Sequence, residues 1–150
     1  MATKKNKKEA RKPRKKGVAR RARRVARRPK LLLTSNGQVA SIIIGPRAAN
    51  DLRIMWGVPV LEGGGFWTRN SKEIPKTRFI FLAGINDFHF SPTGRFRKGG
   101  KPLTPPPGAN DIEIIWDGNF ITEAWWTKDG ERFEEIPIEP GTGDISVDWS

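Results

Sequence analysis

The sequence contains no cysteine and no tyrosine, and its only histidine is His89. Without cysteine, disulfides, thiolate catalysis and cysteine-ligated zinc or iron–sulfur sites are excluded. Long hydrophobic runs are also missing: the first residues lack the roughly 7–15-residue apolar segment of a secretory signal, and no window reaches the roughly 18 apolar residues of a membrane-spanning helix. We therefore expect a soluble protein that is made in the cytosol and has no membrane partner.

Acidic residues are nearly absent from the first 30 residues. That segment carries 16 of the 28 Lys and Arg residues and one acid, Glu9, for a net charge of +15. Residues 31–150 hold the other 12 basic residues against 15 acids, for a net charge of −3. Charge concentrated in one segment indicates a polycationic arm joined to a mildly acidic domain. The sequence thus predicts an arm over residues 1–30 and one β domain over residues 31–150.

The arm has two halves of different composition. Lys4–Lys16 contains no apolar residue larger than alanine, so it cannot bury enough surface to offset its chain entropy, and we expect it to be disordered. Gly17–Arg28 spaces Val and Ala at helical intervals between six Arg residues. This pattern predicts a short helix that forms only when phosphates neutralise the guanidinium groups.

Sixteen basic side chains on a flexible segment can follow a phosphate backbone regardless of sequence and release its condensed counterions. Arginine adds bidentate phosphate contacts and stacking on unpaired bases. The arm therefore favours nucleic acid as the partner, with single-stranded RNA preferred and DNA also compatible. The residues predicted to bind it are Lys4, Lys5, Lys7, Lys8, Arg11, Lys12, Arg14, Lys15, Lys16, Arg20, Arg21, Arg23, Arg24, Arg27, Arg28 and Lys30.

From Leu31 onward the pattern changes to short β segments separated by Gly, Asn, Asp and Pro. Asn36-Gly37 predicts a hairpin between residues 31–34 and 39–44. Two successive Asp-Gly turns near the C-terminus predict an antiparallel meander. The strands expected in the last 40 residues are Ile112–Trp116, Phe120–Thr127, Arg132–Ile138 and Ile145–Trp149.

The middle of the domain has weaker signals. Leu52–Leu61 alternates as a strand does, and Pro59 favours an edge strand or a bulge there. Arg78–Ile85 is an apolar run typical of a central strand, whereas residues 86–111 are expected to be a long Gly- and Pro-rich irregular segment. Eight or nine strands without a convincing helix indicate an all-β fold, an antiparallel β-sandwich or jelly roll.

Six Trp and eight Phe residues invite a base-stacking interpretation. Large rings inside strand patterns more often fill a core or an interface, which is the interpretation we favour. Adjacent Trp125 and Trp126 must point to opposite faces of their strand, so one faces the core and the other a sheet surface or a neighbouring subunit. We therefore predict Trp125 and Trp126 as interface residues.

No set of residues points to catalysis. His89 shares a strand face with Asp87, but no Ser, Cys or Lys at a suitable spacing supplies a nucleophile. Gly63-Gly64-Gly65 lacks the Lys-Ser/Thr ending of a phosphate-binding loop and is predicted to be a flexible turn. We expect no enzymatic activity, no catalytic residue, no cofactor and no small-molecule substrate.

A carboxylate cation site is conceivable near the C-terminus. Asp144 and Asp148 would approach Glu134 and Glu135 if the last two strands paired with each other. We favour the simpler interpretation of solvated acidic side chains, and no metal ligand is predicted.

The arm from Lys4 to Arg28, ended by Pro29 and followed by one β domain, resembles the coat proteins of small icosahedral plant and insect viruses, with satellite viruses closest in size. The resemblance implies a jelly-roll subunit that self-assembles into the shell of a virion and holds the genome on its inward arm. It also implies production in the host cytoplasm, and the basic clusters are compatible with nuclear import. A shell of 60 copies would carry about 960 Lys and Arg side chains on its arms. That number is of the same order as the number of phosphates in a small genome.

Two alternatives belong to other functional classes. One is a cellular protein, such as a ribosomal or chromatin-associated β domain whose basic tail threads into RNA or DNA. The other is an enzyme that the arm tethers to nucleic acid, which is the least favoured because no catalytic constellation is present. Uniform closed shells in electron microscopy would support the coat protein, whereas monomers or dimers would support the cellular binder.

Overall fold

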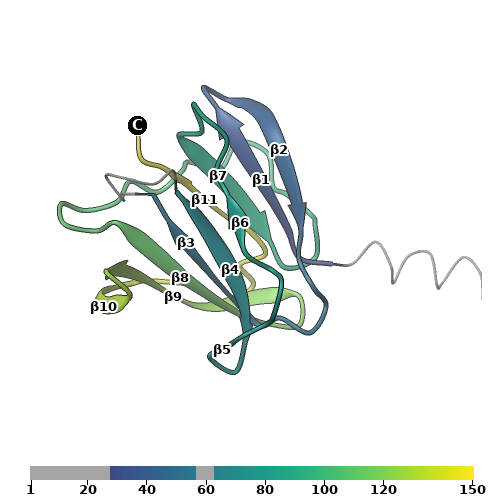
Figure 1. The fold of residues 1–150 in the computed structure, drawn as a ribbon. Coiled ribbons are helices and arrows are strands. Elements are labelled where there is room, and N and C mark those ends of the chain that lie inside the picture. The colour runs from purple at the N-terminus through teal and green to yellow at the C-terminus, as the bar shows by residue number, and fades with distance from the viewer. Residues whose placement is uncertain (1–27, 57–62) are drawn as a thin grey trace, which may run out of the picture.

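The computed structural model describes residues 28–56 and 63–150. Within these residues the chain is all-β, with eleven strands in two antiparallel sheets that enclose one core (Figure 1). The described ranges contain no helix that is long and apolar enough to cross a bilayer. The expected all-β, two-sheet fold is confirmed.

The strands differ in length and fall into two groups. One sheet is built from β1 (Lys30–Ser35), β2 (Gln38–Ile44), β7 (Asp87–Ser91) and β11 (Ile145–Asp148). The other is built from β3 (Asp51–Met55), β4 (Gly64–Arg69), β5 (Lys72–Glu73), β6 (Phe79–Ile80), β8 (Asp111–Asp117), β9 (Phe120–Lys128) and β10 (Glu131–Ile136). The four-stranded sheet has the order β11-β7-β1-β2, and the seven-stranded sheet has the order β10-β9-β8-β3-β4-β5, with β6 paired to β4.

The predicted N-terminal hairpin is present as β1 and β2. Asn36 and Gly37 connect the strands with positive φ angles of 51° and 85°, the backbone that a two-residue hairpin turn needs. Asn and Gly reach this region at low cost, so the turn also fixes the register, with Ser35 opposite Gln38. Leu31 and Leu33 then point into the core.

The predicted C-terminal meander is confirmed for β8, β9 and β10, which pair in sequence order. Strand β11 does not continue it. It belongs to the other sheet, where it pairs with β7. Its residues Ile145 and Val147 are buried in the core between the two sheets. The Pro- and Gly-containing segment 137–144 thus carries the chain from one sheet to the other.

The prediction of a central strand at Arg78–Ile85 is wrong. Only Phe79 and Ile80 are in a strand, and β6 is a two-residue pairing with β4. Phe81 is buried, but Ile80 and Leu82 are 70% and 53% exposed. The apolar residues of this segment are therefore only partly buried, whereas a central strand would be buried on both of its faces.

A central strand lies instead within the predicted irregular segment. Strand β7 is bonded on both sides, to β1 and to β11. Phe88 and Phe90 fill the core, while Asp87 and His89 point to the outer face. The strand has only two apolar residues and is followed by many Gly and Pro residues, so the segment as a whole has the composition of an irregular region.

The prediction for Leu52–Leu61 is corrected in two respects. Strand β3 ends at Met55, and it is central because it pairs with both β4 and β8, so it is not an edge strand. Pro59 lies outside the described residues. Leu52 and Ile54 are fully buried, as expected for a strand in the middle of a sheet.

The glycine triplet is not a flexible turn, because Gly64 and Gly65 belong to β4. A Cβ on Gly64 would meet the carbonyl oxygen of Phe79, and one on Gly65 would meet the carbonyl oxygen of Arg53. The two glycines therefore allow the backbones of neighbouring strands to approach closely.

Candidate functional site

Two of the predicted nucleic-acid-binding residues, Arg28 and Lys30, lie within the described ranges. The others, from Lys4 to Arg27, lie outside them, together with the expected helix over residues 17–28 apart from its last residue. Arg28 donates a hydrogen bond from Nε to the carbonyl oxygen of Gly45, at 3.2 Å. Lys30 is already the first residue of β1, one residue earlier than expected, and lies opposite Ile44 and Ser91. Lys30, the last residue of the basic segment, is therefore part of the four-stranded sheet.

A hollow of about 690 Å³ lies beside this entry point. Pro29 contributes to its lining, as do the last two residues of β8, Trp116 and Asp117. Arg47 and Arg69 contribute two exposed guanidinium groups to the lining. An open hollow with two arginines and one acid is suited to an anionic group.

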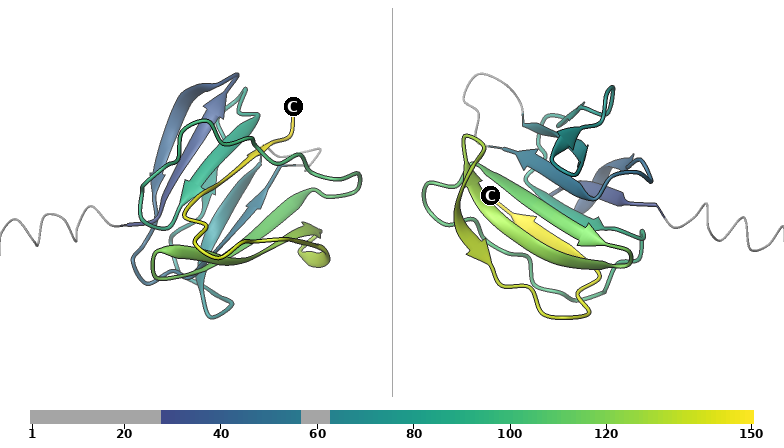
Figure 2. Two further views of the ribbon diagram at one scale, coloured as in Figure 1. Left: turned by 180° about the vertical axis from the view of Figure 1, so that it is seen from behind. Right: turned by 90° about the horizontal axis from the view of Figure 1, so that it is seen from below.

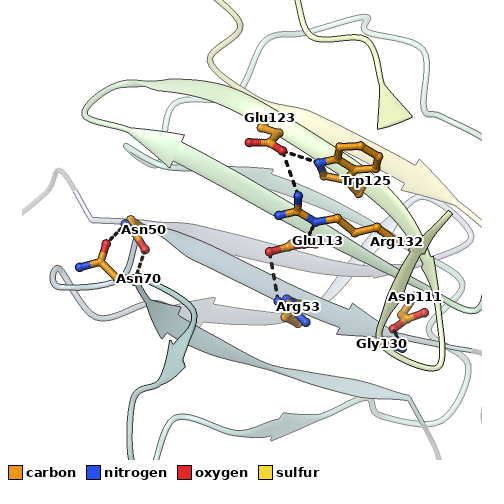
Figure 3. A network of polar contacts seen from close by, with 9 residues as sticks. All are labelled: Asn50, Arg53, Asn70, Asp111, Glu113, Glu123, Trp125, Gly130 and Arg132. Carbon is orange, nitrogen blue, oxygen red and sulfur yellow. Dashed lines mark hydrogen bonds and ion pairs between the residues drawn. The ribbon is translucent and has the colours of Figure 1, made fainter. Parts of the chain in front are cut away.

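The backbone around Arg69 is held in place. Asn50 Nδ2 donates to Asn70 Oδ1 at 3.0 Å, and the Asn70 amide donates to Asn50 Oδ1 at 3.0 Å (Figure 3). Arg69 Nη1 donates to the carbonyl oxygen of Ala48 at 3.3 Å. These bonds connect the loop after β2 to the turn between β4 and β5, so the basic side of the hollow has a defined shape.

A second group of basic residues lies in the segment between β7 and β8, which begins next to the arm because Ser91 pairs with Lys30. Figure 2 shows this segment crossing the outer face of the four-stranded sheet. Residues 92–101 contain no acid. Their basic side chains are all exposed: Arg95, Arg97, Lys98 and Lys101. We refer to these four residues as the basic loop.

Buried acceptors hold the basic loop. Ser91 Oγ accepts hydrogen bonds from the amides of Thr93 and Arg95, at 3.2 and 3.1 Å. Asp144 Oδ2 accepts one from the amide of Arg97, at 2.8 Å. These bonds hold the backbone of the basic loop, from which the exposed Arg95 and Arg97 side chains extend. Arg97 Nε also lies 3.9 Å from Asp144 Oδ1, so its guanidinium is paired with the same carboxylate.

His89 pairs with Asp144 and not, as its strand position suggested, with Asp87. Its Nε2 lies 2.7 Å from Asp144 Oδ2, and the ring of Phe96 packs edge-on at 4.5 Å between centroids. Asp144 is 8% exposed and is shared with the basic loop. Within the described ranges this pair supports a loop, and no nucleophile is bonded to His89.

Asp87, the residue expected to partner His89, faces a different neighbour. Its cross-strand partner is Asp148 on β11. Burial raises the pKa of Asp87, and the nearby charge of Asp148 raises it further.

Trp125 and Trp126 point to opposite faces, as their adjacency requires. Trp126 is buried and packs edge-to-face on Trp56, with ring centroids 6.2 Å apart. Trp125 is half-buried on the outer face of the seven-stranded sheet, where its Nε1 donates to Glu123 (Figure 3). The guanidinium of Arg132 lies over its ring, 4.9 Å from the centroid. Of the two rings, Trp125 is therefore the one that reaches the surface.

A buried carboxylate lies opposite this aromatic residue on the neighbouring strand, β8. Glu113 is 1% exposed and accepts hydrogen bonds from Arg132 Nε at 2.9 Å and from Arg53 Nη2 at 3.1 Å (Figure 3). Burial pushes the pKa of Glu113 up, but the two guanidinium groups outweigh burial and leave that pKa below its usual value. No sequence pattern indicates this network, because Glu113 occupies the outward position of an ordinary strand alternation.

The cation site considered at the C-terminus does not form. Asp144 and Asp148 flank or belong to β11 in one sheet, whereas Glu134 and Glu135 are on β10 in the other. Over residues 28–56 and 63–150, no group of three or more His, Asp or Glu side chains is arranged to hold a metal.

The described residues thus offer a basic side around the entry of the arm and an aromatic, ion-paired face around Trp125. The first combines the hollow beside Pro29 with the start of the basic loop. The second is built over Glu113. Comparison of the chain with protein-family models, with curated proteins and with solved structures found no match to either the sequence or the fold.

Proposed function

We propose that this protein is a capsid subunit whose β domain self-assembles into an icosahedral shell and whose basic arm packages a viral genome, with single-stranded RNA favoured. The observation that carries the proposal is the division of charge: +15 in residues 1–30 and −3 in residues 31–150. A nearly neutral body can tile edge to edge without strong repulsion, while the positive charge is directed to one side.

The position of the described bases supports a nucleic-acid-facing side. The arm enters at Lys30, and the basic loop begins at the residue paired with it, Ser91. Arg47 and Arg69 line the same hollow as Pro29. A phosphate backbone held by the arm would therefore meet further basic side chains on the body.

The two-sheet body is compatible with a coat-protein jelly roll, and we include that fold in the proposal in its general form, as a shell-forming β-sandwich. The hairpin β1–β2 and the meander β8–β9–β10 keep consecutive strands in one sheet, a departure from a simple pair of Greek keys. In this proposal Trp125 contributes to subunit contacts, and the protein is located in the virion and the host cytoplasm, with nuclear import through the arm.

The decisive experiment mixes the full-length, nuclease-treated protein with single-stranded RNA or DNA and examines the product by electron microscopy. Uniform closed particles that need nucleic acid are expected, because +15 charges per subunit repel until phosphates screen them. Monomers or dimers bound to nucleic acid, without particles at any salt or pH, would replace the capsid with the cellular-binder alternative.

A companion experiment compares full-length protein with a variant lacking residues 2–27, which keeps every described strand. We expect RNA affinity to fall more than tenfold while thermal melting is retained. For the full-length protein, log K should fall steeply with log salt, by roughly 0.7 per phosphate contact on a single strand. A shallow slope with preference for one sequence would contradict electrostatic packaging.

A further inference from the structure

The two sheets have four edges, and three of them are protected in the ways that prevent strands from pairing with other molecules. Strand β10 carries four charged residues in six. The edge beyond β4 consists of β5 and β6, which are only two residues long each, and both residues of β5 are charged. The edge of β11 is covered by Leu103, whose amide donates to Ser146 at 2.8 Å and whose carbonyl oxygen accepts from Asp148 at 2.9 Å.

Strand β2 is the exception. It is the outer strand of the four-stranded sheet (Figure 1) and has seven residues, none of them charged and none of them proline. Val39, Ile42 and Ile44 are 53%, 55% and 46% exposed. A long, uncharged, β-branched edge of this kind is the structure that natural proteins avoid leaving unpaired.

The register identifies which backbone groups are unused. The Gly45 amide donates to the Pro29 carbonyl oxygen at 2.7 Å, and the pairs Leu31↔Ile43 and Leu33↔Ser41 continue that ladder. In an antiparallel ladder alternate residues point their N–H and C=O groups to opposite sides. The amide and carbonyl groups of Ile42 and Ile44 therefore point away from β1, and no described residue bonds to them.

We propose that β2 pairs antiparallel with β2 of a second copy, joining two four-stranded sheets into one eight-stranded sheet across a twofold axis. Two identical antiparallel strands are complementary by symmetry, since each donor meets the matching acceptor. The absence of charge on β2 allows it to face itself without repulsion. Ile42 and Ile44 lie on one face, so their side chains would cover those of the copy.

The alternative occupant within this chain is the arm, and its chemistry fits poorly. The arm is dense in Lys and Arg, whereas the side chains on this edge are apolar. The β2 dimer requires neither nucleic acid nor a closed shell, so it goes beyond the capsid proposal and is testable separately.

The first test is sedimentation velocity of the full-length, nuclease-treated protein at roughly 0.5 M salt, where repulsion between arms is screened. Wild type is expected to show a concentration-dependent monomer–dimer equilibrium. Ile42→Lys should weaken dimerisation at least about tenfold, because it places two like charges against each other. The matched control is Leu82→Lys, which adds the same charge at a residue of similar exposure, 53%, in the segment between β6 and β7 rather than on the β2 edge, and should dimerise as wild type.

The second test separates strand pairing from simple apolar contact. Ile42→Pro removes an outward amide while leaving the bonds to β1, a position where edge strands tolerate proline. It should also abolish the dimer. In hydrogen exchange, the amides of Ile42 and Ile44 should become protected as protein concentration rises.

A wild-type protein that stays monomeric at millimolar concentration would overturn the proposal, as would a dimer that survives Ile42→Lys. Protection of the Ile42 amide in a monomer, independent of concentration, would mean that the chain's own arm covers the edge and would also overturn it. Particles formed by Ile42→Lys with RNA would leave the capsid proposal standing without this interface. A wild-type β2 dimer that forms no particles would support the β2 interface and contradict the capsid proposal.

Discussion

Glu113 is buried directly under Arg132, with 2.9 Å between its Oε1 and the arginine Nε. The same guanidinium lies over Trp125, so one arginine connects a buried carboxylate to the aromatic residue at the surface. This contact joins β8, β9 and β10 through side chains as well as through their backbone ladders.

Replacing Glu113 with Gln should destabilise the fold by about 2 kcal/mol near neutral pH. The substitution leaves the guanidinium groups of Arg53 and Arg132 without their charge partner, and their partial exposure reduces the cost from that of a fully buried pair. Because the folded-state pKa of Glu113 is lowered, its contribution exists above the ordinary glutamate pKa and is lost as pH falls through the folded value. Urea denaturation should therefore show a difference that shrinks in acid. Glu134→Gln, at an exposed residue of β10, is the control; equal losses in both variants would contradict the prediction.

Asp51→Asn should stabilise the protein near neutral pH. Burial raises the pKa of Asp51, and the adjacent charge of Glu113 raises it further. A carboxyl group with a raised folded-state pKa favours folding below its unfolded value of 3.8, and that contribution is lost as pH rises through the folded value. The advantage of Asn over Asp should thus grow from acid to neutral pH in urea titrations. The same change at exposed Asp117 should give no such trend, and a flat difference at position 51 would refute the assignment.

Gly65→Ala should cost more than about 2 kcal/mol, because its Cβ would collide with the carbonyl oxygen of Arg53 on the adjacent strand. Gly143→Ala is the matched control, since nothing lies within 4 Å of a Cβ at that position and its φ is not in the left-handed region. Thermal melting of both variants distinguishes them. Equal melting temperatures would mean that β3 and β4 separate easily, contrary to their close approach.

Trp125→Glu should reduce particle formation with RNA while the folded monomer is preserved, because this ring is on the outer face of the sheet. Trp126→Glu should instead unfold the domain, since Trp126 is buried against Trp56. Phe133→Glu, which replaces another exposed aromatic residue of the neighbouring strand, is the control for a general effect of added charge. Normal particles from folded Trp125→Glu protein would remove Trp125 from the interface.

The turns were predictable because their signals are local. Asn36-Gly37 and Asp129-Gly130 both adopt the positive φ angles that their residue types favour, and each connects the two strands on either side of it. The division of charge is likewise a property of the chain and needs no structure to be seen. Opposite faces for Trp125 and Trp126 followed from the period of two in any β-strand.

Tertiary structure alone decided which strands lie at the centre and which side chains meet. Strand β7 is central because β1 and β11, far from it in sequence, pair on its two sides, and no local pattern encodes such pairings. The same applies to His89, whose partner Asp144 is 55 residues away, and to Glu113, whose outward position is covered by Arg132. Alternation fixes the face of a side chain, but burial depends on what packs over that face, and an edge is defined only by the absence of a neighbouring strand. The sequence by itself therefore determined the arm, the β character and the turns, whereas the sheet order, the buried ion pairs and the open edge of β2 were decided by contacts between distant parts of the chain.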